Sequence, residues 1–211
     1  MAQTNLGNMF RLFSTVWEPV SLRQADLVVS GTLQSDAKVV WEALGLPAAP
    51  VEAFADDLSS YLGRDANEVM HELRREETRL FLTSQALVAN TEGIWRKKAE
   101  GYKIVSFMIN SYSLEVADFM RQCGVVKAQD KNECLDYVHT ECEFAGMLAD
   151  GPEYLAKAGK DPIALLDQFV EEHLTRWLPG FCADVARETA SPYHTASAAF
   201  FAAFLRELQE D

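Results

Sequence analysis

The sequence predicts an all-α fold, because apolar residues recur at helical spacing and strand patterns are scarce. Apolar side chains follow one another three or four positions apart along most of the 211 residues, as they do over residues 9–17. Alternation typical of strands occurs only over residues 25–33 and 102–107, and both stretches lie among helical patterns. Hydrophobic residues make up 48% of the chain, which is enough to bury a core and argues against disorder.

Capping residues, prolines and glycines set the expected limits of each helix. The expected helices, in chain order, are residues 9–17, ended by Pro19; 38–44, capped by Ser35 or Asp36 and ended by Gly45 and Pro47; 67–82, opened by Asp65 with Glu68 as in a capping box; 111–123, ended by Gly124; 132–149, ended by Asp150, Gly151 and Pro152; 162–178, opened by Asp161 and Pro162 and halted at Pro179 and Gly180; and a last helix opened by Ser191 and Pro192.

The domain organisation follows from one break in this pattern. Between Gly124 and Asn132 the chain becomes mostly polar and lies between two helical segments. We expect a linker there. The prediction is an N-terminal helical lobe over residues 1–124, a hinge over residues 125–132 and a smaller C-terminal helical lobe over residues 133–211.

Charge and the start of the chain restrict the class of partner and the location. The net charge is −13, which repels nucleic acid and anionic lipid and attracts a basic partner. The N-terminus has no export signal and no stretch of about 18 apolar residues occurs, so we expect a cytoplasmic protein without stable membrane insertion. The four cysteines form no CxxC pair and are expected to be reduced thiols.

Motifs of catalysis and of cofactor binding are absent from the sequence. It contains no glycine-rich phosphate loop, no nucleophile elbow and no zinc-protease helix, so we expect no catalytic residue, metal or cofactor. His139, Cys142 and Glu143 lie on one expected helix, where His139 and Glu143 share a face and could contribute to a metal site, but a partly exposed helix face is the commoner outcome. His173 falls on an apolar stripe, where a core histidine with a hydrogen-bonded ring is expected.

A cluster of carboxylates precedes and enters the expected helix 132–149. Glu133 and Asp136 lie three positions apart and could face the same way, with Glu141 further along. Paired acids of this kind can act in acid–base chemistry, can cap a helix, or can bind an arginine-bearing peptide. The chain also supplies many methionine and aromatic side chains, which can line a groove for an apolar segment although most of them belong to the core.

Three segments of the chain resemble the TorD/DmsD/NarJ family of chaperones that mature redox enzymes. The matching residues are, in the first segment, Glu77, Leu80 and Phe81 followed by Trp95; in the second, Glu133, Asp136, Glu141 and Phe144; and in the third, Phe169, His173, Trp177, Phe181 and Tyr193. In the loop of the first segment, Asn90 and Gly93 replace the usual proline and serine of the family. The second segment departs from the family pattern, because Cys134 replaces a proline, Tyr137 a histidine and Cys142 a leucine.

The resemblance implies a TorD-like helical bundle of two lobes joined by a hinge. It also implies a cytoplasmic chaperone, not an enzyme, whose partner is the catalytic subunit of a molybdopterin-containing oxidoreductase. The chaperone would bind that subunit's twin-arginine signal peptide or N-terminus until cofactor insertion and folding are complete, as a monomer or a homodimer. Acidic groups around Glu133 and Asp136 would attract the arginines. The residues expected to contact the client are Glu77, Phe81, Trp95, Glu133, Asp136, Tyr137, Glu141, His173 and Trp177.

Two other functions fit the residues and stay open at this point. A helical metal- or nucleotide-dependent hydrolase would use the carboxylates at 133–143 together with His139. A structural adaptor would use its helices only for self-association, and would have no affinity for leader peptides.

Overall fold

The structure, a computed structural model, describes residues 2–83, 85–102, 109–126 and 134–210. Every regular element within these ranges is helical, which confirms the predicted all-α class. The strand-like stretch at 25–33 lies in two helices, and most of the stretch at 102–107 is outside the described residues.

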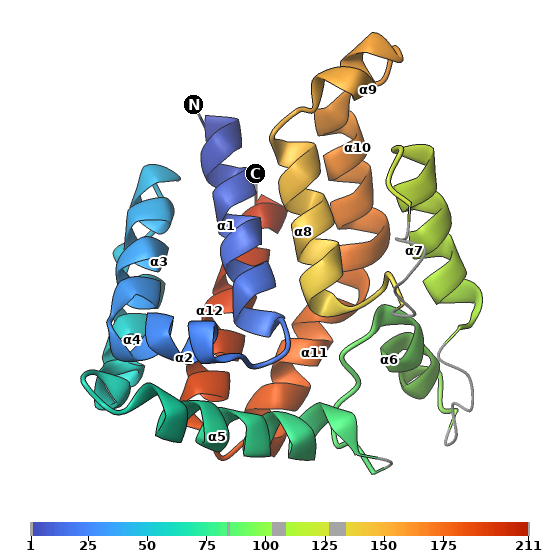
Figure 1. The fold of residues 1–211 in the computed structure, drawn as a ribbon. Helices are drawn as coiled ribbons and strands as arrows, with labels where there is room; N and C mark the ends of the chain where they lie inside the picture. The colour runs from blue at the N-terminus through green and yellow to red at the C-terminus, as the bar shows by residue number, and fades with distance from the viewer. Residues whose placement is uncertain (1, 84, 103–108, 127–133, 211) are drawn as a thin grey trace.

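Figure 1 shows the helices in their order along the chain. Those of the first half are α1 (Ala2–Trp17), α2 (Leu22–Val29), α3 (Thr32–Ala43), α4 (Ala48–Asp57), the 3₁₀ turn η1 (Ser59–Tyr61), α5 (Ala66–Glu77), the π-helical segment η2 (Thr78–Leu82) and α6 (Glu92–Ala99). Those of the second half are α7 (Ser111–Gln122), α8 (Val138–Ala149), α9 (Glu153–Lys157), α10 (Pro162–Phe169), the π-helical segment η3 (Val170–Leu174), α11 (Thr175–Glu188) and α12 (Pro192–Glu210).

Helix α1 lies at the centre of the molecule. It packs against α8 and α3, and α12 lies behind it in the view of Figure 1. The aromatic face of α1 meets the phenylalanines of α12, where the Phe13 and Phe201 rings stack with centroids 4.2 Å apart and Phe10 contacts Phe204 edge-on at 5.3 Å. These rings are fully buried and supply much of the apolar area that stabilises the fold.

Two glycines allow α1 and α8 to cross in close contact. A Cβ on Gly146 would lie 3.0 Å from the carbonyl oxygen of Gly7, and a Cβ on Gly7 would lie 3.1 Å from the carbonyl oxygen of Gly146. Beside this crossing Arg11 of α1 forms an ion pair with Asp150 at the end of α8. The backbones of an early and a late helix therefore touch at this point.

Several predicted helix limits are confirmed by their capping geometry. The Asp65 carboxylate accepts hydrogen bonds from the amides of Asn67 and Glu68, and Asp161 caps α10 with Pro162 at the first helical position. Helix α7 ends at Gln122 just before Gly124, where φ is +81°.

Three predicted helix starts are wrong, and the first of them is that of α1, which begins at Ala2 and not at residue 9. The second predicted helix corresponds to α3. It begins at Thr32, not after Ser35 or Asp36, because Gly31 with φ of +79° reverses the chain directly after α2. Helix α8 begins at Val138, not at residue 132, because residue 137 pairs with Thr91 in an isolated antiparallel bridge and holds the chain extended.

The predicted stop at Pro179 and Gly180 is also wrong, since α11 continues through both residues to Glu188. A proline inside a helix clashes with the carbonyl four residues earlier, here that of Thr175. The π-helical segment η3 ends at Leu174, directly before this residue.

The predicted lobes are in contact through α1. Helices α1 and α4 from the N-terminal side pack against α8 and α12 respectively. Of the predicted hinge only residues 125 and 126 are described, and residues 127–132 lie outside the described part of the chain. The division at residue 124 stays a prediction.

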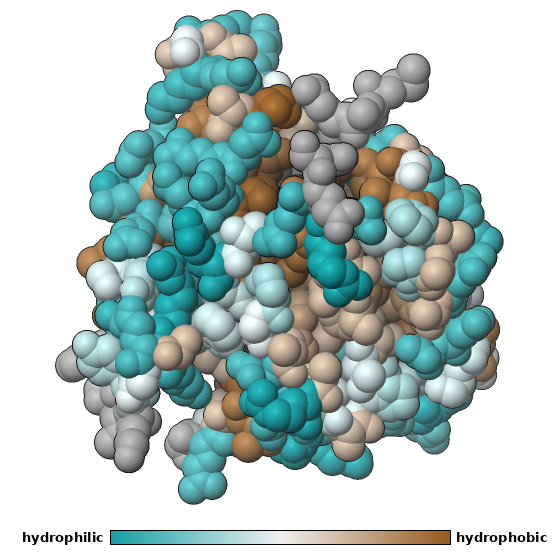
Figure 2. Space-filling model, turned by 180° about the vertical axis from the view of Figure 1, so that it is seen from behind, coloured by the Kyte–Doolittle hydropathy of each residue, from teal (hydrophilic) through white to brown (hydrophobic). Residues whose placement is uncertain are grey.

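The face opposite to that of Figure 1 is covered mainly by hydrophilic side chains, with apolar patches between them (Figure 2). A groove of about 400 Å³ lies between α11 and α12, and its lining includes the alanines Ala183, Ala186 and Ala202. Among the described helices none is long and apolar enough to cross a membrane.

Candidate functional site

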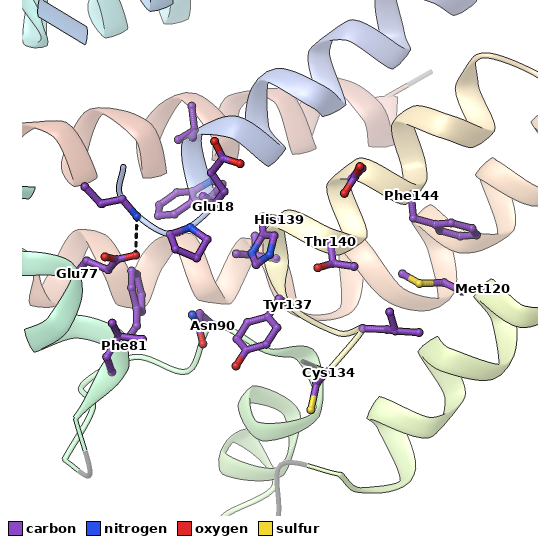
Figure 3. Close-up of a pocket in the computed structure, with 18 of the residues that line it drawn as sticks. Glu18, Glu77, Phe81, Asn90, Met120, Cys134, Tyr137, His139, Thr140 and Phe144 are labelled. Atoms are coloured by element: carbon purple, nitrogen blue, oxygen red, sulfur yellow. Dashed lines mark hydrogen bonds between the residues drawn. The ribbon is translucent and has the colours of Figure 1, made fainter. Parts of the chain in front are cut away.

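The candidate site is a groove of about 740 Å³ to which five of the described helices contribute. Its walls come from the end of α1, the end of α5 with η2, the end of α7, one side of α8 and the start of α12 (Figure 3). A volume of this size is within the range of about 300–1,000 Å³ typical of ligand pockets, and it can hold a short polypeptide segment.

The two ends of the groove differ in chemistry. One end, called here the acidic end, comprises Trp17, Glu18, Glu77, Phe81 and His194. The other, called here the apolar end, comprises Met120, Val125, Val126, Phe144 and Met147. Figure 3 shows Glu18, Glu77 and Phe81 on one side, Met120 and Phe144 on the other, and Tyr137, His139 and Thr140 between them.

Glu77 is fixed at the acidic end by a backbone hydrogen bond. Its Oε1 accepts the amide hydrogen of Val20 at 3.0 Å, and the Nε of Arg74 donates to the carbonyl of the same Val20 at 3.0 Å. Burial raises the pKa of Glu77, while the Val20 amide and the nearby Arg74 lower it. The two bonds to Val20 tie the end of α5 to the chain that follows α1.

Helix α6 begins directly beneath the groove, and a residue distant in sequence caps it. Thr91 occupies the N-cap position without making a side-chain cap bond. Instead Asp136 Oδ2 accepts the amide hydrogen of Gly93 at 2.9 Å, while its backbone carbonyl accepts that of Glu92 at 2.9 Å. Burial raises the pKa of Asp136 to about 6, although the Gly93 hydrogen bond lowers it.

Next to this cap lies a buried network centred on Glu92. One oxygen of Glu92 pairs with Arg96 at 2.6 Å, and the other is 2.9 Å from Nδ1 of His173. Burial, and then the neighbouring Glu92, raise the pKa of Glu141 well above its usual range. Oε2 of Glu141 accepts the indole hydrogen of Trp177 at 2.9 Å.

The structure does not bring all of the predicted client-binding residues to the groove. Glu77, Phe81 and Tyr137 line the groove. Asp136, Glu141, His173 and Trp177 are buried beneath it and join α6, α8, η3 and α11. Trp95 is half-buried, with its indole hydrogen donated to Asp184 at 2.9 Å and its ring against Gly180. Glu133 lies outside the described residues.

Sequence reasoning missed several residues of this region. Glu18, Asn90 and His194 line the groove, and Glu92 organises the network below it. A signal for Glu92 exists in the sequence, since Arg96 follows it by four positions at the start of a helix. Nothing local marks Glu18 or His194, because they meet only when α1, α5 and α12 pack together.

The burial of these carboxyl groups does not favour hydrolysis. Asp136 and Glu141 are fully buried, so a substrate in the groove would meet neither of them. His139 and Glu143 do line the groove. Within the described residues no three His, Cys, Asp or Glu side chains are arranged to hold a metal ion.

Comparisons with known proteins agree with the fold. The model of a protein family described as the nitrate reductase delta subunit matches residues 46–183. A crystal structure of a protein from Archaeoglobus fulgidus, proposed to act in redox enzyme maturation, superposes with a TM-score of 0.54. The two chains are 19% identical, and the alignment covers 95% of this chain and 93% of that one. No curated protein matches the chain.

Proposed function

Since the chain belongs to the nitrate reductase delta subunit family, as the match over residues 46–183 establishes, we propose that it holds a molybdopterin-containing oxidoreductase subunit during maturation. This membership confirms the resemblance to the TorD/DmsD/NarJ chaperones. The proposed client segment is the twin-arginine signal peptide or N-terminus of the catalytic subunit. The chaperone would act in the cytoplasm, as a binding protein and not an enzyme, until cofactor insertion and folding are complete.

The groove is the observation that best supports this proposal. A twin-arginine leader combines a cationic stretch with an apolar stretch, and the groove offers carboxylates beside methionine, valine and phenylalanine side chains. Unbranched methionine side chains adapt to different apolar sequences, which suits a site that receives a flexible segment. The net charge of −13 would increase the association rate with a cationic segment.

Titration calorimetry with synthetic leader peptides tests this function. The peptides would be the N-termini of the molybdopterin oxidoreductase catalytic subunits encoded in the source genome. We expect saturable binding of at least one of them, with a negative heat-capacity change because apolar surface is buried. If every leader failed to bind, the proposed function would be rejected.

A substitution at the apolar end makes the same experiment specific to the groove. Val126 is 72% exposed, so Val126→Asp should leave the stability unchanged while placing a charge where the apolar stretch would lie. We expect the Kd for the leader to rise by about tenfold, corresponding to about 1.4 kcal/mol. The matched control is Val39→Asp on α3, a valine that is 63% exposed and does not line the groove, and it should leave Kd unchanged.

A further inference from the structure

The acidic end of the groove contains two carboxylates that converge from different helices. Glu18 follows the last residue of α1, and Glu77 is the last residue of α5. Both lie close enough to the hydroxyl of Tyr193 to raise its pKa, together with burial, which is the larger cause. A cation bound at this end of the groove would interact favourably with both of these partly buried carboxylates.

The helix geometry adds to this negative potential. Helix α1 ends at Trp17, and residues 16–18 line this end of the groove, whereas the helical chain of α5 continues directly into η2. The C-terminal end of a helix carries a partial negative charge that favours cations. Two cations act on this end: Arg74 on Glu77 and Arg79 on His194, and Nε of Arg74 donates to the carbonyl of Val20.

Two buried polar groups at the same end have no partner within the described part of the chain. They are the indole nitrogen of Trp17, a side chain 8% exposed, and Nδ1 of His194, a side chain 3% exposed. The ring centroids of Trp17 and Phe181 are 4.9 Å apart, and those of Phe81 and Phe181 are 6.1 Å apart. The ring centroid of Phe81 lies 6.4 Å from that of His194. Buried donors and acceptors are normally satisfied, so these two groups indicate a ligand with backbone-like polar atoms.

His194 would not repel a cation at this end. Burial lowers the pKa of His194 to about 4, so its imidazole is neutral at physiological pH. A neutral ring can exchange a hydrogen bond with a peptide group, while Trp17 can donate to a peptide carbonyl.

The apolar end of the groove differs from the acidic end in the residues that line it and in the contacts that they make. Phe144 packs edge-on against Phe119 at 6.1 Å, and the sulfur of Met147 lies 3.5 Å from the hydroxyl of Tyr154. The third carboxylate of the lining, Glu143, is exposed on α8 and so interacts mainly with solvent.

We infer that the groove binds the client segment in one direction, with its arginines between Glu18 and Glu77 at the acidic end and its apolar residues along the apolar end. This inference rests on the proposed function and assigns the arginine contact to Glu18 and Glu77. The buried Asp136 cannot make it, because its carboxylate is fully covered and is bonded to Gly93.

A double-mutant cycle tests the arginine contact. The variants are Glu18→Gln and Glu77→Gln, and the peptides are a leader and the same leader with its arginines replaced by glutamine. Glutamine at 77 keeps the oxygen that accepts the Val20 amide, so the fold should persist, which a thermal melt verifies. We expect each variant to weaken the arginine peptide by about tenfold and the glutamine peptide by less than about twofold.

Two further variants serve as references. Glu52→Gln on α4 removes an exposed charge far along the chain from the groove lining, and it should change neither affinity by more than about twofold. Glu143→Gln should have a smaller effect than Glu18→Gln or Glu77→Gln. The assignment of the arginine contact would be overturned if Glu143→Gln weakened binding more than Glu18→Gln or Glu77→Gln did. It would also be overturned if Glu18→Gln and Glu77→Gln lost the same affinity for the arginine peptide and the glutamine peptide.

Photocrosslinking tests the direction. A leader with a photo-reactive residue beside its arginines should crosslink to residues 16–20 or 77–82, and one with that residue in its apolar stretch should crosslink to residues 120–126 or 144–147. The reverse pattern overturns the inference and leaves the proposed function intact. Failure of the wild-type protein to bind any leader removes both.

Discussion

At the scale of single residues, the Asp136 carboxyl group has two opposing influences on its ionisation. The amide of Gly93 favours the charged form, whereas complete burial disfavours it more strongly and raises the pKa to about 6. A pKa above the usual 3.8 means that the folded state binds this proton more tightly than the unfolded state. The contribution of Asp136 to stability is therefore greatest below pH 3.8, and it is lost as the pH rises through 6.

This sign gives a prediction for Asp136→Asn. Asparagine stays neutral and can still accept the Gly93 amide, so the variant should lack the loss of stability that the wild type suffers between pH 4 and 6. As the pH rises through this window, the unfolding free energy of the variant should increase relative to that of the wild type by on the order of 3 kcal/mol. Urea unfolding at pH 4, 5 and 7 measures it, and a difference that does not vary with pH would contradict the assigned protonation.

The same residue explains why part of the site could not be predicted. As a helical residue, Asp136 was expected to face the same way as Glu133 and to attract arginines. In the structure it precedes α8 and caps α6, a helix that begins 44 positions earlier in the chain. Such a cap is a non-local contact, and local sequence patterns carry no signal for it. Glu77 and Phe81 were predicted for the site and do line the groove, although their binding role stays a prediction.

At the scale of helices, the crossing of α1 and α8 depends on two residues without side chains. Replacing glycine by alanine inside a helix normally stabilises by about 1 kcal/mol. Gly146→Ala should do the opposite, because the new Cβ would lie 3.0 Å from the backbone carbonyl of Gly7, which cannot move without shifting all of α1.

We expect Gly146→Ala to lower the unfolding free energy by about 1–3 kcal/mol. Chemical denaturation of the wild type and the variant measures this. A stabilised variant would mean that the two helices can separate slightly at no cost, and would contradict the description of a fixed crossing.

Sequence reasoning succeeded for helices whose limits are set by their own residues. Asp65 caps α5 and Asp161 caps α10 as predicted, because the capping side chain is adjacent to the amides that it satisfies. It failed at Pro179, since whether a proline ends a helix depends on the preceding turn. Here that turn is the π-helical segment η3, which no residue pattern announces.

At the scale of the whole molecule, the packing of α1 bears on the predicted division at residue 124. Helix α1 belongs to the N-terminal side, yet its main neighbours are α8 and, through the phenylalanines, α12. We expect thermal unfolding to occur as one transition, with tryptophan fluorescence and far-ultraviolet circular dichroism giving the same midpoint. Two separate midpoints would instead support lobes that unfold independently.

The stacking of Phe13 on Phe201 has a consequence for biosynthesis. The ribosome makes α1 first and α12 last, and at about 5–20 residues per second the intervening chain takes roughly 10–40 s to complete. Throughout that interval the aromatic face of α1 lacks its final partner and is open to wrong associations. The nascent protein thus passes through a stage in which it needs the same kind of protection from premature contact that we propose it later gives to another chain.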